Sequence, residues 1–230
     1  MGNFDSEYWK LINNTEDFIK YGCITDRVLG DAVLKPEPKK EPDSLSKIAS
    51  QVEQCRLCRL CEKRNRVVPG MGVESPDVLV VGEGPGADED AQGLPFVGKA
   101  GQYLDKWLDA IQLSRHTNCF IGNMVKCRPP MNRDPQPDEI AACLPYLERQ
   151  IALLKPRFIL TVGRISSAVL TGQEAGIGRL RGRTYSFHGI PLIPTYHPSA
   201  VLRDPSLRRP VWDDLRRLKA ELEEIKNAIH

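Results

Sequence analysis

The chain has 230 residues, with a hydrophobic fraction of 41% and a charged fraction of 27%, which indicates one globular domain with room for an appendage. Its net charge of +2 excludes an overall basic binder of nucleic acid, so any basic surface must be local. No apolar run approaches the roughly 20 residues that cross a bilayer, and the N-terminus lacks the order of a secretory signal, so we expect no membrane contact.

The first 43 residues are predicted to form an N-terminal extension, and residues 44–230 a single domain. Aromatic and aliphatic residues between positions 8 and 19 give the extension a short amphipathic segment. The stretch KPEPKKEPDS that follows is rich in proline and charge, as linkers are. A dispensable appendage and a segment that docks a partner are the two interpretations.

The rest of the chain alternates strands and helices. Four short apolar strands are predicted, at 77–81, 118–123, 158–162 and 190–196. Helices are predicted at 44–66, 97–113, 138–154, 163–170 and 211–225. A glycine-punctuated hairpin region precedes the last strand. The alternation predicts a three-layer α/β/α fold with a central, mainly parallel four-stranded sheet.

Seven cysteines without a secretory signal indicate metal or redox chemistry rather than disulfides. Cys55 and Cys58 form a C-x2-C pair, and Cys127 and Cys143 lie on two later segments. Two such pairs can close a four-thiolate site, which suits zinc or an iron–sulfur cluster. The second pair lacks the C-x2-C spacing of a zinc ribbon, which favours the cluster. The remaining cysteines are expected to be small buried side chains or, for Cys61, a competing ligand: Cys23, Cys61 and Cys119.

The stretch 82–96, GEGPGADEDAQGLPF, directly follows the first predicted strand. It matches the dinucleotide-binding pattern GxGxxA, but the acidic run 88–90 would repel a pyrophosphate, and no GK[ST] follows to make a P-loop. Open backbone amides, the carboxylates of Glu83 and Glu89 and the ring of Phe96 suit a planar, partly anionic ligand such as a nucleobase. Core packing of Phe96 and helix capping by the acidic residues are the structural alternatives.

Polar side chains follow two other predicted strands. Asn123 ends the second strand, and His197 follows the fourth. Because parallel strands bring their carboxyl ends to one edge of the sheet, we expect both beside the glycine-rich loop. An amide can read the edge of a base, and a histidine can donate to an oxygen that gains negative charge. A turn-forming Asn123 and a structural His197 are the alternatives.

With these residues assembled, the chain resembles the family 4 uracil-DNA glycosylases, the iron–sulfur type of bacteria and archaea. The resemblance extends from about Cys55 to Leu218. It rests on five blocks in order: the C-x2-C-x-L segment with the downstream RVV, GEGPGADEDAQGLPFVGKAGQ, NMVKCRPPMNRDP, the cysteine at position 143, and PTYHPSAVLR.

The resemblance implies a DNA repair enzyme that flips uracil out of single- or double-stranded DNA and hydrolyses its N-glycosidic bond. Phe96 would stack on the uracil, Asn123 would read its polar edge, and His197 would contact its O2. Gly82 and Gly86 belong to the uracil-binding loop. The resemblance also implies a [4Fe–4S] cluster with four thiolate ligands: Cys55, Cys58, Cys127 and Cys143.

Uracil leaves as an anion, so we predict that His197 and backbone amides near Gly84 and Gly86 stabilise it. Glu83 is the first candidate to orient the attacking water, and Glu89 is the second. No lysine nucleophile is required, which predicts a monofunctional enzyme that leaves an abasic site.

The segment after His197 is predicted to enter the DNA groove, with Val201 or Leu202 filling the gap that the base leaves. Its predicted DNA-binding residues are Ser199, Val201, Leu202 and Arg203. The cluster is expected to place a phosphate-binding surface beside the pocket, formed by four basic residues close to the cysteines: Arg56, Arg59, Lys126 and Arg128.

We expect a cytoplasmic monomer that acts on the chromosomal DNA of a bacterium or archaeon. Two other classes of function are compatible with the same residues. One is a metal-stabilised nucleic-acid-binding module without base release, and the other is a dinucleotide-dependent iron–sulfur redox protein. Release of uracil from DNA separates the enzyme from both. A third alternative keeps the superfamily but shifts the activity to other deaminated bases or to tight capture of uracil.

Overall fold

The structure is a computed structural model that describes residues 42–227, so Cys23 and nearly all of the predicted extension lie outside the described residues. None of the helices in that range is long and apolar enough to cross a membrane. The α-helices are α2 (Leu45–Gln54), α3 (Ala87–Gln92), α4 (Lys99–Ala110), α5 (Pro137–Leu154), α6 (Arg164–Thr171), α7 (Ile177–Leu180), α8 (Pro198–Arg203) and α9 (Arg208–Asn227). The strands are β1 (Met71–Gly72), β2 (Val78–Gly82), β3 (Cys119–Asn123), β4 (Phe158–Val162), β5 (Tyr185–Phe187) and β6 (Ile190–Thr195). Short 3-10 helices are η1 (Arg59–Glu62), η2 (Pro130–Asn132) and η3 (Pro205–Leu207).

The strands form one sheet in the order β1-β3-β2-β4-β6-β5. The four predicted strands, β2, β3, β4 and β6, are its parallel centre. The predicted number of four is wrong, because β1 and β5 add antiparallel edges that make a six-stranded sheet. The edge strands have only two and three residues, which is too short to give a recognisable alternation of apolar residues in the sequence.

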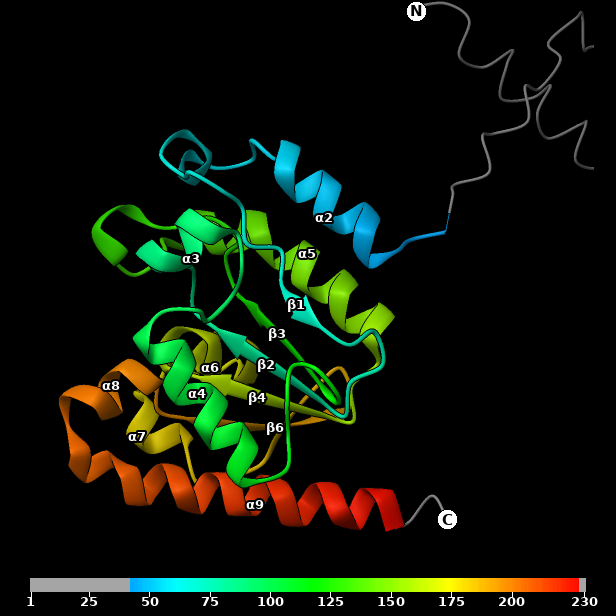
Figure 1. Ribbon diagram of the computed structural model, residues 1–230, viewed down its shortest axis with the longest axis vertical. Helices are drawn as coiled ribbons and strands as arrows, with labels where there is room; N and C mark the ends of the chain where they lie inside the picture. The colour runs from blue at the N-terminus through cyan, green and yellow to red at the C-terminus, as the bar shows by residue number, and fades with distance from the viewer. Residues whose placement is uncertain (1–41, 228–230) are drawn as a thin grey trace, which may run out of the picture. The chain divides into compact units, whose positions relative to one another are not determined.

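Alternate residues of the central strands face two helical layers, which confirms the three-layer α/β/α fold (Figure 1). Val78 and Val80 of β2 pack in a core with α4 and α9, whereas Leu79 and Val81 pack with α5. The crossovers explain this split. The chain passes from β2 through α4 to β3, and it returns through α5 to β4 on the other side of β2, so right-handed connections place α4 and α5 on opposite faces.

The helix predicted at 44–66 is shorter than expected. Ser44 caps its N-terminus, where the side-chain Oγ accepts a hydrogen bond of 3.1 Å from the N–H of Lys47. The helix ends at Gln54 because Cys55 adopts an extended backbone, and a loop containing η1 follows. The first cysteine pair therefore lies on a loop, and the directions of its thiols are not set by the geometry of a helix.

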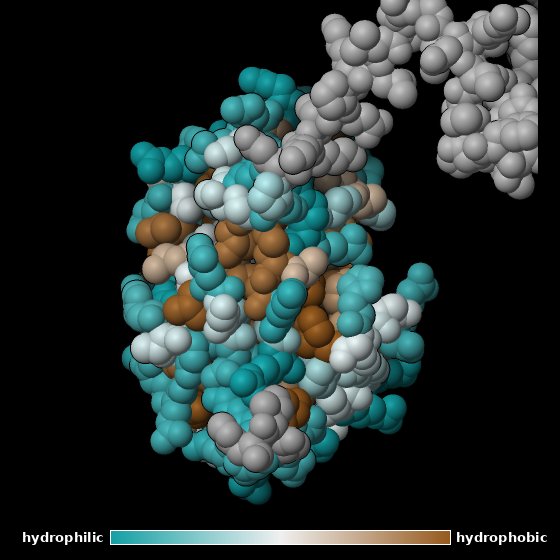
Figure 2. Space-filling model, turned by 90° about the vertical axis from the view of Figure 1, so that its right-hand side faces the viewer, coloured by the Kyte–Doolittle hydropathy of each residue, from teal (hydrophilic) through white to brown (hydrophobic). Residues whose placement is uncertain are grey.

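The carboxyl ends of the parallel strands lie on the left of Figure 1, beside α3, α8 and the start of α4. The connections from β2 and β4 diverge at this end, which makes it the topological switch point where open α/β folds bind ligands. The face on the right of Figure 1 carries a central group of apolar residues among hydrophilic ones (Figure 2). A groove near the amino ends of β4 and β6, lined in part by Ile151, Pro156 and Ile190, contains none of the predicted site residues.

Candidate active site and cysteine cavity

A cleft of about 460 Å³, called the pocket below, opens at the carboxyl ends of β2, β3, β4 and β6. Its volume lies within the range of about 300–1,000 Å³ that small-molecule sites occupy. The fold therefore brings together segments that are far apart in the sequence. Nine of the lining residues are predicted site residues: Glu83, Gly84, Gly86, Glu89, Phe96, Asn123, His197, Ser199 and Arg203.

Asn123 places a buried amide in the pocket. It is the last residue of β3, and it is only 1% exposed. Its Oδ1 atom is buried and has no hydrogen-bond partner within residues 42–227. A buried acceptor without a partner costs about 1–3 kcal/mol, so this atom is suited to a ligand that donates a hydrogen bond.

Gly82 does not line the pocket, but its lack of a side chain leaves room for two residues that do, Asn123 and Phe96. It is the partner of Asn123 in the parallel register of β2 and β3. A Cβ atom at Gly82 would lie 2.4 Å from Oδ1 of Asn123 and 2.5 Å from Cζ of Phe96. Any larger residue at this position would therefore displace the amide or the aromatic ring.

Phe96 is held in an unusual backbone conformation, with a φ of +52°. Arg115 fixes this turn, because its Nη1 donates to the carbonyl oxygen of Pro95 at 2.8 Å and its Nη2 to that of Phe96 at 2.9 Å. Asp105 accepts from the same guanidinium and keeps it oriented. The Phe96 ring lies 5.8 Å from the imidazole of His197 between centroids, so both rings border the same part of the pocket.

His197 presents Nε2 as its hydrogen-bond donor. Its Nδ1 accepts from the N–H of Ser199 at 3.1 Å, and because an N–H only donates, the proton of the neutral ring is on Nε2. Burial lowers the pKa of His197 to about 4, helped by the positive charge of Arg203 and opposed by Glu89. The imidazole is therefore a neutral donor near pH 7.

Glu83 has the pKa of a base that works near neutral pH. Burial raises the pKa of Glu83 to about 7, the negative charge of Asp134 adds to the effect, and Arg164 opposes it. Asp134 and Arg164, which both line the pocket, form an ion pair with each other. A carboxyl group with a pKa near 7 is ionised in about half of the molecules at neutral pH, and its ionised form can accept a proton or orient a water molecule.

Glu89 uses both of its carboxylate oxygens to hold the loop. Oε2 accepts from the N–H of Gly86 at 3.1 Å, and Oε1 accepts from the N–H groups of Val97 and Gly98 at 2.9 and 3.0 Å. Glu89 therefore joins the N-termini of α3 and α4. Because the N–H of Gly86 is engaged in this way, it is not an open donor for a ligand.

The helix after His197, α8, has some side chains in the core and others at the surface or in the pocket. Ser199 and Arg203 line the pocket, and Leu202 is 47% exposed. Val201 is only 1% exposed and packs in the core with α4 and α9, so the prediction that it could enter DNA is wrong. Consecutive residues of a helix point about 100° apart, which is why neighbours in α8 have opposite environments.

Two segments of the pocket were not predicted. Gly163 and Arg164 follow β4, and they lie at a strand end as Asn123 and His197 do, so the same signal was present for them in the sequence. The segment between β3 and α5 carries no comparable signal, because its place depends on how a proline-rich loop folds back. It contributes Pro129, Asn132, Arg133 and Asp134.

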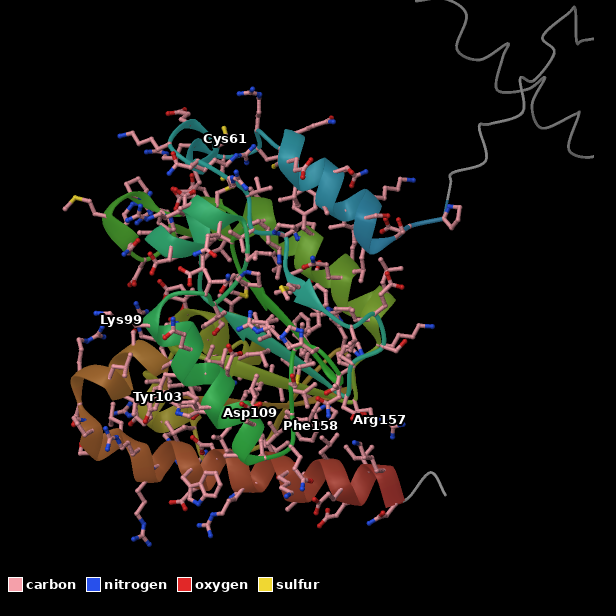
Figure 3. All side chains as sticks on the ribbon, in the orientation of Figure 1. Cys61, Lys99, Tyr103, Asp109, Arg157 and Phe158 are labelled. Atoms are coloured by element: carbon pink, nitrogen blue, oxygen red, sulfur yellow. The ribbon has the colours of Figure 1, made fainter. Side chains whose placement is uncertain are left out.

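A second cavity is lined by thiols from the loop after α2, the segment after β3 and helix α5. Figure 3 labels one of them, Cys61, near the loop that follows α2. No carboxylate lines this cavity within the described part of the chain, so the donor set suits a soft metal centre. Cys119 lies instead in the core, as predicted. The five cysteines of the cavity are Cys55, Cys58, Cys61, Cys127 and Cys143.

Among residues 42–227, no three Cys, His, Asp or Glu side chains converge closely enough to hold a single metal ion. A tetrahedral zinc site needs all its thiolate sulfurs about 2.3 Å from one centre. An iron–sulfur cluster spreads its cysteine ligands around a larger body, so the residues present fit a cluster better than a zinc ion.

Hydrogen-bond donors reach two of the sulfur atoms. Nη1 of Arg64 donates to Sγ of Cys127 at 3.0 Å, and the N–H of Lys126 donates to Sγ of Cys143 at 3.3 Å. Burial raises the pKa of Cys143 to about 11 and also raises the pKa of Cys127, so thiolates need compensation there. A metal centre deprotonates its thiol ligands, and such donors stabilise the charge that results.

Lys126 is buried, so the prediction that it contacts DNA phosphates is wrong. Its Nζ donates to the main-chain oxygen of Asn123 at 2.9 Å and to Oε1 of Gln150 at 2.7 Å. Burial lowers the pKa of Lys126 to about 8, opposed by the nearby Cys143. The lysine therefore connects the end of β3 with α5 and with the cysteine cavity.

Comparison with known proteins finds the same family that the sequence motifs resemble. Residues 69–216 match the family model of the uracil DNA glycosylase superfamily. The chain is 42% identical over 188 residues to a type-4 uracil-DNA glycosylase of Saccharolobus solfataricus, an alignment that covers 78% of this chain and 87% of the relative. It is 44% identical over 179 residues to one from Pyrobaculum aerophilum, covering 74% and 91%. It is 40% identical over 177 residues to one from Thermotoga maritima, covering 75% and 92%.

Proposed function

Because the chain belongs to the uracil DNA glycosylase superfamily, and within it to the type-4 enzymes, we propose that it is a uracil-DNA glycosylase of DNA repair. It rotates uracil out of the stacked bases and hydrolyses the bond between uracil and its sugar. The product is an abasic site in a strand that is otherwise intact. Recognition of uracil, departure of the base and attack of water each require different residues of the pocket.

The observation that carries this proposal is the unpartnered Oδ1 atom of Asn123. Uracil has a donor at N3–H next to an acceptor at O4, and an amide side chain can pair with both. Cytosine has an amino group in place of O4 and no hydrogen on N3, so both pairs are lost. Asn123 would therefore select uracil, while the ring of Phe96 stacks on it.

The departing uracil gains negative charge, which His197 would stabilise. Its Nε2–H is the donor in the neutral ring, because Nδ1 accepts from Ser199. A donor that is oriented before the reaction stabilises the transition state without reorganising. The low pKa of His197 means that this donor stays in the same protonation state across the neutral range.

Water then attacks the sugar carbon, and Glu83 is the carboxylate that we assign to orient it. Its pKa of about 7 suits a group that accepts a proton near neutral pH. Glu89 is the weaker candidate, because three backbone N–H groups already bind its carboxylate. Glu89 instead keeps the loop 86–98 in the shape that the pocket requires.

A [4Fe–4S] cluster bound by Cys55, Cys58, Cys127 and Cys143 is proposed as a structural cofactor. When bound, it would supply covalent crosslinks between the loop after α2 and the segment after β3. Lys126 and Arg64 would stabilise the charge on the ligand sulfurs. No step of base removal requires electron transfer, so the chemistry of the pocket rests on the side chains of the chain.

Uracil-containing DNA is the proposed partner, and a monomer that acts on chromosomal DNA in the cytoplasm stays a prediction. Arginines line the pocket from three segments, at Arg133, Arg164 and Arg203. Lys99, the first residue of α4, projects from the same side (Figure 3). Guanidinium and ammonium groups in such a position suit phosphates on either side of the target nucleotide, so affinity should fall as salt rises.

The proposal is tested with protein purified without air and a labelled single-stranded oligonucleotide that contains one uracil. The strand is incubated with chelator, treated with alkali and examined for cleavage, with a thymine strand as the control. We expect cleavage only after alkali and only at uracil. Asn123→Asp should lose most of this activity and gain some release of cytosine. Absence of cleavage, from protein whose visible absorption shows an intact cluster, would contradict the proposal.

A further inference from the structure

The segment between β3 and α5 exposes a large apolar side chain beside the pocket. Met131 is 95% exposed, more than any other large apolar residue in the described range. Its sequence neighbours Pro129, Asn132 and Arg133 line the pocket. A single exposed apolar residue is common on protein surfaces, so exposure alone does not assign a role to it.

The backbone at Met131 gives a second and independent observation. Both Met131 and Asn132 have a φ of +54°, in the left-handed region that glycine adopts without cost. Neither residue is glycine, so the loop holds a strained shape. Such strain persists only where the surroundings fix it, and it gathers at sites that bind or switch.

Side chains brace this loop from both ends. Nε of Arg128 donates to Oδ1 of Asn132 at 2.8 Å. The guanidinium of Arg133 donates to both carboxylate oxygens of the buried Glu139, at 2.8 and 2.6 Å. These contacts fix the loop in a conformation that keeps Met131 in solvent.

A matching side chain lies on another border of the pocket. Leu202 of α8 is 47% exposed, and its neighbour Arg203 lines the pocket. The pocket thus has an exposed apolar side chain next to each of two lining segments. Arginines belong to both segments. Arg133 is already paired with Glu139, so it is Arg203 whose charge suits the phosphates of a polyanion with apolar faces between them.

We propose that Met131 is a DNA wedge that packs against the base next to the flipped nucleotide, on the opposite side from Leu202. This inference rests on the proposed glycosylase function. Rotating a base out of a duplex leaves its neighbours without a stacking partner, and apolar side chains that enter the stack replace the lost contact. Methionine is unbranched and polarisable, so it packs on any neighbouring base.

The wedge affects duplex DNA more than single strands, because only the duplex must be opened. We compare kcat/KM on a duplex and on a single strand of the same sequence. Met131→Ala should lower the duplex value about tenfold and change the single-strand value by less than about twofold. Met131→Leu should keep most of the duplex activity. Trp212→Ala, at an exposed residue of α9 outside the pocket lining, is the matched control and should match the wild type.

A fluorescent base analogue that brightens when unstacked, placed on either side of the uracil, locates the wedge directly. In the wild type we expect a signal on both sides, and in Met131→Ala the signal should change on one side only. Leu202→Ala should change the other side. A change on the same side for both variants, or on neither side, would overturn the assignment.

Met131→Gly distinguishes the effect of backbone strain on activity from the effect of side-chain contact with DNA. Glycine adopts the left-handed φ without cost, and it has no side chain to contact a base. Its duplex defect should equal that of Met131→Ala. Recovery of duplex activity in the glycine variant would overturn the wedge. An equal loss of activity on the duplex and on the single strand would also overturn it, because such a loss indicates damage to the pocket. A wild type that releases no uracil from either substrate refutes the glycosylase function itself.

Discussion

The ammonium group of Lys126 donates a hydrogen bond of 2.9 Å to the main-chain oxygen of Asn123, and both residues are buried. The same ammonium binds Gln150, and the main-chain N–H of Lys126 reaches the sulfur of Cys143. A charge buried at this depth is costly unless its partners compensate it. Lys126 therefore holds the end of β3 that carries Asn123 against the cysteine cavity.

Replacing Lys126 by methionine should lower both stability and activity. Methionine fills similar space but leaves the oxygens of Asn123 and Gln150 without their donor, at a cost of about 1–3 kcal/mol in the free energy of unfolding. Because Asn123 then loses part of its support, we expect a fall of about tenfold in the single-turnover rate. Urea unfolding and uracil release measure the two effects. Lys219→Met on the surface of α9 is the control, and an unchanged rate in Lys126→Met would contradict the link.

Glu83→Gln should remove the pH dependence of base release. Glu83 must be ionised to take a proton from the attacking water, so the wild-type rate should rise with pH and reach half its maximum near pH 7. The glutamine variant should be about a hundredfold slower and flat with pH. Burial raises the pKa of Glu83 in the folded protein above its pKa in the unfolded chain. Folding therefore becomes less favourable as pH rises from the unfolded pKa to the folded pKa. Glutamine does not ionise, so the free energy of unfolding at pH 8 should be higher for the variant than for the wild type.

Glu89→Gln should behave in the opposite way. An amide offers one acceptor oxygen in place of two charged ones, so the bonds to Gly86, Val97 and Gly98 weaken. We expect lower stability and a retained pH profile, measured in parallel with Glu83→Gln. If Glu89→Gln were the variant that lost the pH dependence, the roles of the two carboxylates would be reversed.

His197→Ala should reduce the single-turnover rate about a hundredfold or more, the usual effect of losing one donor to a developing anion. The wild type should show no titration of His197 between pH 5 and 8, because burial lowers its pKa to about 4. Ser199→Ala leaves the backbone N–H that orients Nδ1 and should cost far less. Ser199 Oγ also lies 2.8 Å from Nδ1, so equal losses in the two variants would show that this hydroxyl, and not the backbone N–H, orients the imidazole.

Cys143→Ala should lose the bound iron and the visible absorption of the cluster, whereas Cys61→Ala should keep both. The two thiols line the same cavity, but only Cys143 has a main-chain donor at its sulfur in the structure. Iron content and absorption of protein purified without air provide the measurement. If Cys143→Ala retained its iron and Cys61→Ala lost it, Cys61 and not Cys143 would be the cluster ligand.

The order of the elements was predictable because it depends on local patterns. Five-residue apolar strands such as Val78–Gly82 and helices with an apolar stripe are visible in the sequence. The rule that parallel strands share their carboxyl ends then placed Asn123 and His197 beside the glycine loop. The edge strand β1 was not predicted, and β5 was predicted only as part of a hairpin region, because two or three residues carry no periodicity.

The sequence by itself determined the family resemblance, the parallel centre of the sheet and the strand ends at which the pocket lies. It could not distinguish Glu83 from Glu89, which lie on the same loop, nor Val201 from Leu202, which are neighbours. Tertiary structure gives the members of each pair different surroundings, since the backbone N–H groups of Val97 and Gly98, just before α4, bind Glu89, and Val201 packs in the core. The physical reason is that burial and hydrogen bonding depend on segments distant in the chain, whereas residue type and spacing report only what is near.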